Sequence, residues 1–152
     1  MIALSIRALM LTAFLATPLA AVAQPAPVLA PVSVEQAWAR ATPGQSNVGA
    51  LYLTLRAATA DRLASLSTPV SGMAMLHETR DVGGTMQMRD LTGLALPAGE
   101  RVAMRPGGVH VMLMDLSHPL KLGEHFPVTL MFDHAPPVTV EVTVARAGAS
   151  AP

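Results

Sequence analysis

Cysteine is absent from the 152-residue chain. Without a thiolate, the protein cannot build a Cys-ligated zinc site, a blue-copper centre or an iron–sulfur cluster, and it has no Cys nucleophile. A domain of this size can fold in an oxidising compartment without disulfides. Any soft-metal chemistry in this protein must therefore use other donors.

The N-terminal apolar run is too short to span a membrane. Ala8 to Ala16 is almost entirely apolar, follows Arg7 and ends before Pro18, whereas a spanning helix needs roughly 20 residues. A basic residue, a short apolar run and the small-x-small sequence Ala21-Val22-Ala23 are typical of a secretory signal. We expect cleavage after Ala23, so that residues 1–23 are a signal peptide. An N-terminal membrane anchor is the alternative.

The chain also lacks a charge excess of either sign. Ten Lys and Arg stand against ten Asp and Glu, and loss of the signal removes only Arg7, which leaves a net charge of about −1. No basic excess is present to bind nucleic acid or anionic lipid. The flanks are rich in Pro and Ala, so we expect flexible tails over 24–32 and 147–152 around a single domain over 33–146.

Helical periodicity is missing as well. No segment keeps a 3.6-residue apolar period over three turns, and short apolar segments alternate with Pro and Gly turns from residue 33 onward. This pattern predicts an all-β fold, an antiparallel β-sandwich or barrel, with Trp38 as a core anchor. The expected strands are Val34–Arg40, Gly49–Arg56, Arg62–Ser67, Met73–Thr79, Thr85–Leu91, Arg101–Met104, Val109–Leu116, Phe126–Asp133 and Val138–Val144.

Methionine is abundant, and seven of the ten Met lie between Met73 and Met114. Successive side chains of a strand point to opposite faces. His110, Met112 and Met114 therefore share one face of their strand. The same rule groups residues on two further strands: Met73, Met75 and His77 on one, and Met86 and Met88 on the other.

A hairpin turn is expected at Asp81-Val82-Gly83-Gly84, because Gly tolerates positive φ. Closing the turn about Val82 and Gly83 places His77 directly opposite Met88, with Cβ atoms about 5 Å apart. His110 and Met112 form a second pair of nitrogen and sulfur donors. Together the pairs would make a site of two imidazoles and two thioethers, a donor set that favours Cu(I).

The remaining Met and His residues have ordinary interpretations. Met commonly fills gaps in cores, so five of them are expected to pack there: Met73, Met75, Met86, Met104 and Met131. Three His residues are expected at exposed loop or strand-end positions: His118, His125 and His134. Met114 could serve as an auxiliary ligand or as a core residue, and the core position is favoured.

The spacing of the four donors resembles the motif of the periplasmic copper chaperones called PCuAC: His, ten residues, Met, twenty-one residues, His, one residue, Met. His77, Met88, His110 and Met112 match it in identity and spacing. The segments AWARATPGQSNVGALYLTL and LPAGERVAMRPGGVHVMLMDLSHPLKLGEHFPVTLMF are also similar to the family, and the likeness covers most of residues 33–145. Family members often carry Met two residues after the first His, where this chain has Thr79.

The resemblance implies a cupredoxin-like β-sandwich with a metal near one exposed end. It implies that His77, Met88, His110 and Met112 bind Cu(I), and it does not decide whether Cu(II) is also carried. It also implies a periplasmic location and delivery of copper toward the binuclear copper centre of cytochrome c oxidase. The partners would be subunit II of the oxidase, a Sco-type thiol protein or both, and membrane contact would come only through the acceptor.

The sequence gives less support to other classes of function. We find no nucleophile–base pair, G-x-S-x-G motif or phosphate loop, so an enzyme is not expected. Copper storage or tolerance would use the same site without a dedicated acceptor. An electron-transfer cupredoxin is not favoured, because its blue-copper centre needs a Cys ligand and the chain has none. A metal-free interaction domain is a further alternative, in which the Met residues would serve only to fill the core.

Overall fold

The computed structural model describes residues 31–152. The expected signal peptide (1–23) lies outside the described residues, as do residues 24–30 of the expected N-terminal tail. Within the described range, no helix is long and apolar enough to cross a membrane. The described residues therefore include the whole expected domain and its C-terminal flank.

Every regular element in the described part of the chain is a β-strand, as predicted. The strands are β1 (Val32–Arg40), β2 (Gly49–Ala57), β3 (Asp61–Ser67), β4 (Ser71–Val82), β5 (Thr85–Leu91), β6 (Leu94–Leu96), β7 (Arg101–Ala103), β8 (Val109–Leu116), β9 (His125–Phe132) and β10 (Val138–Ala145). The nine expected strands are all present, with ends shifted by at most three residues. β6 was not predicted, because three residues are too few to show an alternating pattern.

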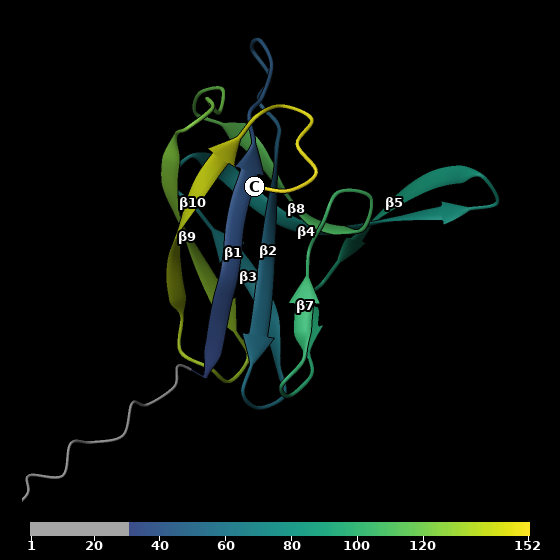
Figure 1. Ribbon diagram of the computed structural model, residues 1–152, viewed down its shortest axis with the longest axis vertical. Coiled ribbons are helices and arrows are strands. Elements are labelled where there is room, and N and C mark those ends of the chain that lie inside the picture. The colour runs from purple at the N-terminus through teal and green to yellow at the C-terminus, as the bar shows by residue number, and fades with distance from the viewer. Residues whose placement is uncertain (1–30) are drawn as a thin grey trace, which may run out of the picture.

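The strands form one open sheet in the order β5-β4-β8-β2-β1-β10-β9-β3-β6, and β7 pairs with β2. Figure 1 shows this path curving into two layers, with β3 behind β1 and β2. The pair β1–β10 is parallel, whereas the other strand pairs are antiparallel. The predicted sandwich is therefore confirmed, but it is mixed rather than purely antiparallel. No hairpin joins the first and last strands, so nothing local dictates that they run in opposite directions.

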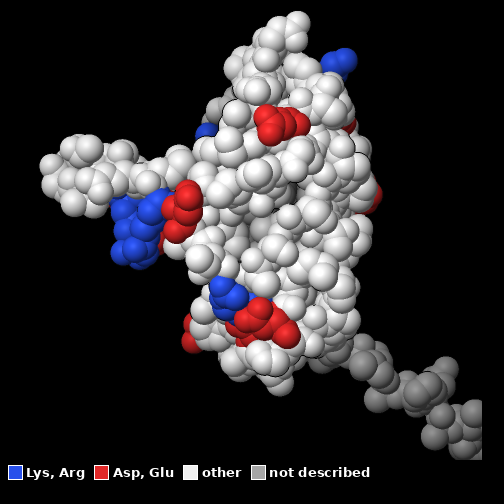
Figure 2. Space-filling model, turned by 180° about the vertical axis from the view of Figure 1, so that it is seen from behind, with Lys and Arg blue, Asp and Glu red and all other residues white. Residues whose placement is uncertain are grey.

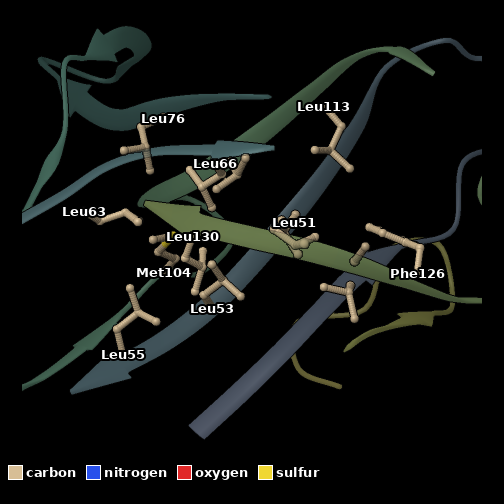
Figure 3. Close-up of a cluster of buried hydrophobic side chains, with 14 of the residues drawn as sticks. Leu51, Leu53, Leu55, Leu63, Leu66, Leu76, Met104, Leu113, Phe126 and Leu130 are labelled. Atoms are coloured by element: carbon tan, nitrogen blue, oxygen red, sulfur yellow. The ribbon is translucent and has the colours of Figure 1, made fainter. Parts of the chain in front are cut away.

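Alternating residues of the strands fill the space between the layers. Leu51, Leu53 and Leu55 of β2 point inward and are almost completely buried, together with Leu63 of β3 and Leu130 of β9. Figure 3 shows these side chains gathered between the layers. On β4 and β8 the inward positions hold Leu76, Val111 and Leu113, which are also buried. The outer face of these two strands is consequently left to the His and Met residues.

Three of the five Met residues expected in the core lie on the surface instead. Met73 is 51% exposed, Met86 59% and Met131 41%, and Met75 is only half-buried, whereas Met104 is buried as predicted. The physical reason is strand parity: hydrophobicity alone does not show which face of a strand turns inward. His118, His125 and His134 are exposed, as predicted.

Trp38 is buried, but in a small cluster separate from the main core. Its ring packs against Tyr52 with a centroid separation of 4.5 Å, and Ala149 is buried in the same cluster. The guanidinium Nε of Arg40 donates a hydrogen bond to the Ala149 carbonyl at 2.7 Å. The predicted burial of Trp38 is therefore confirmed, but the residue anchors this second cluster with Tyr52 and Ala149 and not the space between the layers.

Asp61, at the start of β3, fastens the loop that follows β9. Its side chain is only 4% exposed and accepts hydrogen bonds from the backbone N–H groups of Arg62, His134 and Ala135 and from the His134 ring. Burial raises the pKa of Asp61, but these hydrogen bonds outweigh it and lower the pKa to about 2. The ionised carboxylate is thus part of the folded structure.

Candidate metal centre

The two predicted His ligands face each other across neighbouring strands. β4 and β8 pair antiparallel, and His77 is registered directly opposite His110. Their rings lie edge to face, with centroids 5.9 Å apart and planes at 84°. Both residues are only 7% exposed. Strand pairing therefore brings together two imidazoles that are far apart in the sequence.

The β4–β5 hairpin has a different register from the one predicted. Val82 pairs with Thr85, so Gly83 and Gly84 form the whole turn, with φ of +63° and +84°. A two-residue turn of this kind needs positive φ at both positions, which favours glycine at each. The turn is consequently centred one residue later than expected. His77 lies opposite Asp90, and the prediction that it lies opposite Met88 is wrong.

Met88 nevertheless contacts His77. It pairs with Thr79, which makes it a diagonal neighbour of His77, and its Sδ lies 3.2 Å from the Nδ1 atom of the His77 ring. Diagonal neighbours on a sheet are within reach of long side chains. The expected pair of nitrogen and sulfur donors is therefore present, but the long Met88 side chain has to reach along the strand to form it.

The other ring nitrogen of His77 has no hydrogen-bond partner among the described residues. The carboxylate Oδ1 of Asp90 is 3.0 Å from Nε2, but the two atoms are not aligned for a hydrogen bond. Buried polar atoms without partners are uncommon and call for an explanation. Metal binding would supply one, because neither ring nitrogen of His77 is committed to a strong hydrogen bond within the protein.

His110 is oriented by the turn that precedes its strand. Its Nδ1 lies 3.0 Å from the carbonyl oxygen of Gly108. Because a carbonyl only accepts, we assign the proton to Nδ1, which leaves the lone pair on Nε2. A hydrogen bond from one ring nitrogen to a backbone carbonyl is the usual support for a metal-binding His.

Three of the four predicted donors line one open hollow of about 350 Å³: Met88, His110 and Met112. Arg40 and Tyr52 also line it, and no acidic residue of the described range 31–152 does. Burial raises the pKa of Tyr52, and the nearby Arg40 charge offsets this only in part, so the phenol is neutral at ordinary pH. The hollow itself therefore offers neutral donors and one fixed positive charge, and the carboxylate of Asp90 lies beside His77, which does not line the hollow. Soft, neutral donors suit a soft monovalent ion.

The hairpin that carries Met88 is held by an ion-pair network on its other face. Glu78 accepts hydrogen bonds from Arg80 at 2.8 Å and from Arg89 at 2.6 Å, and these contacts lower its pKa. Figure 1 shows the hairpin projecting from the body of the domain, and Figure 2 shows charged residues of both signs gathered at its base. The network links β4 to β5 close to the Met88 backbone.

Some neighbours of the site were not singled out from the sequence. Asp90 and Tyr52 come near the two His rings only through strand register, and Arg40 joins the hollow from β1. No spacing rule in the sequence would have identified them. The four predicted donors, in contrast, follow from alternation along strands and from the motif spacing.

The chain is similar to a family of lipoproteins and to solved structures of copper-binding domains. The family model "Putative lipoprotein LpqE-like" matches residues 32–144. The protein "Putative lipoprotein Lxx21020" of Leifsonia xyli subsp. xyli is 33% identical over 117 residues, which cover 74% of this chain and 69% of that protein. The solution structure of CuI-DR1885 from Deinococcus radiodurans is 33% identical, with a TM-score of 0.62 and coverage of 76% of this chain and 78% of that one. The copper-bound PCuAC domain from PmoF2 is 27% identical, with a TM-score of 0.64 and coverage of 76% and 93%.

Proposed function

The chain belongs to the LpqE-like family and has the fold of PCuAC domains, and on this basis we propose that it is a copper chaperone that binds Cu(I) through His77, Met88, His110 and Met112. The observation that carries the proposal is the 3.2 Å contact between the His77 ring and the Met88 sulfur, beside a second imidazole that faces the same region. Copper-bound relatives support the choice of metal.

The donor set explains why Cu(I) is the expected cargo. Thioethers are soft and uncharged, so they bind hydrated divalent ions poorly and Cu(I) well, and imidazole is compatible with copper. Four neutral donors leave the charge of the ion uncompensated, which favours reversible holding over permanent burial. Thioethers also cannot form disulfides in an oxidising compartment, although oxidation to the sulfoxide would remove the soft donor.

Release would proceed by ligand exchange. Met88 is half-exposed on the projecting hairpin, so an incoming thiolate or imidazole from an acceptor can replace its sulfur while the His residues still hold the ion. An anionic thiolate binds Cu(I) more strongly than a thioether, and copper therefore passes to it. No substrate bond is broken in this step, so we assign the protein no enzymatic activity.

We further propose that the protein acts in the periplasm after cleavage behind Ala23 and delivers copper toward the cytochrome c oxidase centre, directly to subunit II or through a Sco-type protein. The lipoprotein name of the matched family supports export. The resemblance of the motif to the PCuAC chaperones supports the choice of acceptor.

X-ray absorption spectroscopy of the Cu(I)-loaded protein tests the site. We expect two nitrogen and two sulfur neighbours, and a copper ion with no sulfur neighbour would contradict the assignment. Transfer to a soluble fragment of oxidase subunit II, or to a Sco-type protein, tests delivery. If copper binds as expected but stays on the protein with both acceptors, a storage role replaces delivery.

A further inference from the structure

A row of methionines continues along the sheet beyond the two His residues. On β4 and β8, Met75 is registered opposite Met112, and Met73 opposite Met114. His77 and His110 form the next pair of the same face. Three successive cross-strand pairs of this face therefore contain only imidazoles and thioethers.

Core packing does not account for the methionines at the far end of this row. The inward positions of the two strands are filled by Ala74 and Leu76 on β4 and by Leu113 on β8. Met73 is half-exposed, and Met75 and Met114 are partly buried. Among the described residues, none of the three belongs to the buried core or to the side chains packed against it. They cover the outer face of the sheet.

The geometry of the row allows several sulfurs to meet. Residues directly opposite on antiparallel strands have Cβ atoms about 5 Å apart, and diagonal neighbours are within reach of long side chains. Met73 and Met114 are opposite each other, and Met75 is diagonal to Met114. Three rotatable bonds let each thioether turn toward a common point. The row itself includes no acidic or basic side chain.

We propose that Met73, Met75 and Met114 form a second Cu(I) site that uses thioethers alone. Soft, neutral sulfur donors without a charged neighbour in the row select a soft monovalent ion. Successive pairs on one face of a strand are about 7 Å apart, and Met112 stands between the two sites because it is opposite Met75. This inference goes beyond the proposed function, since the second site does not require His77 or His110.

The test follows the isotope-labelled methyl groups of the methionines by NMR during anaerobic titration with Cu(I). In the wild-type protein, we expect the methyl signals of Met88 and Met112 to shift with the first equivalent. The signals of Met73, Met75 and Met114 should shift with a second equivalent. If none of these three signals shifts in excess Cu(I), the proposal is overturned, and the assignment of the first site is unaffected.

Two variants separate the sites. Met73→Leu, Met75→Leu and Met114→Leu together keep apolar volume and should abolish the second step while the first remains. His77→Ala with His110→Ala should weaken the first step and leave the shifts of Met73, Met75 and Met114 in place. Met131→Leu, another exposed methionine on β9, is the matched control and should change neither step. Retention of two steps in the triple variant would also overturn the proposal.

Discussion

The rings of His77 and His110 lie edge to face across β4 and β8, with centroids 5.9 Å apart. The two residues occupy directly opposed positions, so their relative placement depends on backbone pairing and not on a loop. Leu76, which precedes His77, and Val111, which follows His110, both belong to the buried core. The two proposed imidazole ligands thus stand on paired strands that are packed against the core.

Replacing His110 or Met112 with Ala should lower Cu(I) affinity by at least tenfold, which corresponds to about 1.4 kcal/mol. Neither side chain is part of the main core, so the free energy of unfolding should change less than the free energy of copper binding. Competition with a chromophoric Cu(I) chelator measures the first quantity and urea denaturation the second. Unchanged affinity in both variants would contradict the assignment.

Met86 and Met88 offer a matched pair on β5. Both point to the same face of the hairpin and both are more than half-exposed, but only Met88 contacts His77. Met88→Leu should lower Cu(I) affinity by about tenfold or more, whereas Met86→Leu should leave it unchanged. Chelator competition on the two variants measures the difference, and equal losses would show that the hairpin contributes through its general hydrophobicity.

Replacing Met104 and replacing Met131 should change the free energy of unfolding by different amounts, although both residues lie in or next to strands of the sandwich. Met104 is 3% exposed and belongs to the core, so Met104→Ala should destabilise the fold by about 2–5 kcal/mol. Met131→Ala, at an exposed position, should stay within about 0.5 kcal/mol. Urea denaturation of both variants measures these values. A large loss at Met131 would mean that its side chain is buried in solution.

Asp61 should make stability depend on pH in the acid range. Its pKa is about 2 in the folded protein and 3.8 for the unperturbed group. As the pH falls, Asp61 therefore takes up a proton at a higher pH in the unfolded chain than in the folded protein. The stabilisation from its ionised form is fully present above about pH 4 and is lost as the pH falls toward 2. The Asp61→Asn variant should therefore be less stable than wild type at pH 7, and this difference in stability should become smaller as the pH falls toward 2.

Thermal unfolding between pH 7 and pH 2 measures this dependence on Asp61. The exposed carboxylate of Glu141 on β10 is the control, and Glu141→Gln should follow the wild-type profile. A constant difference between Asp61→Asn and wild type across the whole range would rule out the titration of Asp61 as the cause.

The strands could be predicted from the sequence because a two-residue alternation of apolar side chains is a local property. For this reason the predicted bounds of the strands Val109–Leu116 and Thr85–Leu91 agree with the observed ones. The four proposed donors could also be named, since motif spacing and parity both select His77 and Met88. The opposed placement of His77 and His110 required the pairing of β4 with β8, which is a tertiary feature.

Other features could not be predicted because they depend on contacts distant in the sequence or on fine backbone geometry. The register of the hairpin depends on which two residues take positive φ, and Gly83 and Gly84 do so rather than Val82. The exposure of Met73 and Met131 depends on which face of each strand meets the other layer. The position of Trp38 depends on Ala149, more than a hundred residues away in the chain.

The diagonal reach of Met88 has a mechanical consequence. The backbone of Met88 is paired with Thr79 and its sulfur lies near His77, so the sulfur is positioned by side-chain torsions alone. At the proposed site, Met88 could leave the ion by rotating about its own χ angles, with every hydrogen bond between β4 and β5 kept. Unloading the domain would then require neither a hinge nor local unfolding, and the empty and loaded forms should share one backbone.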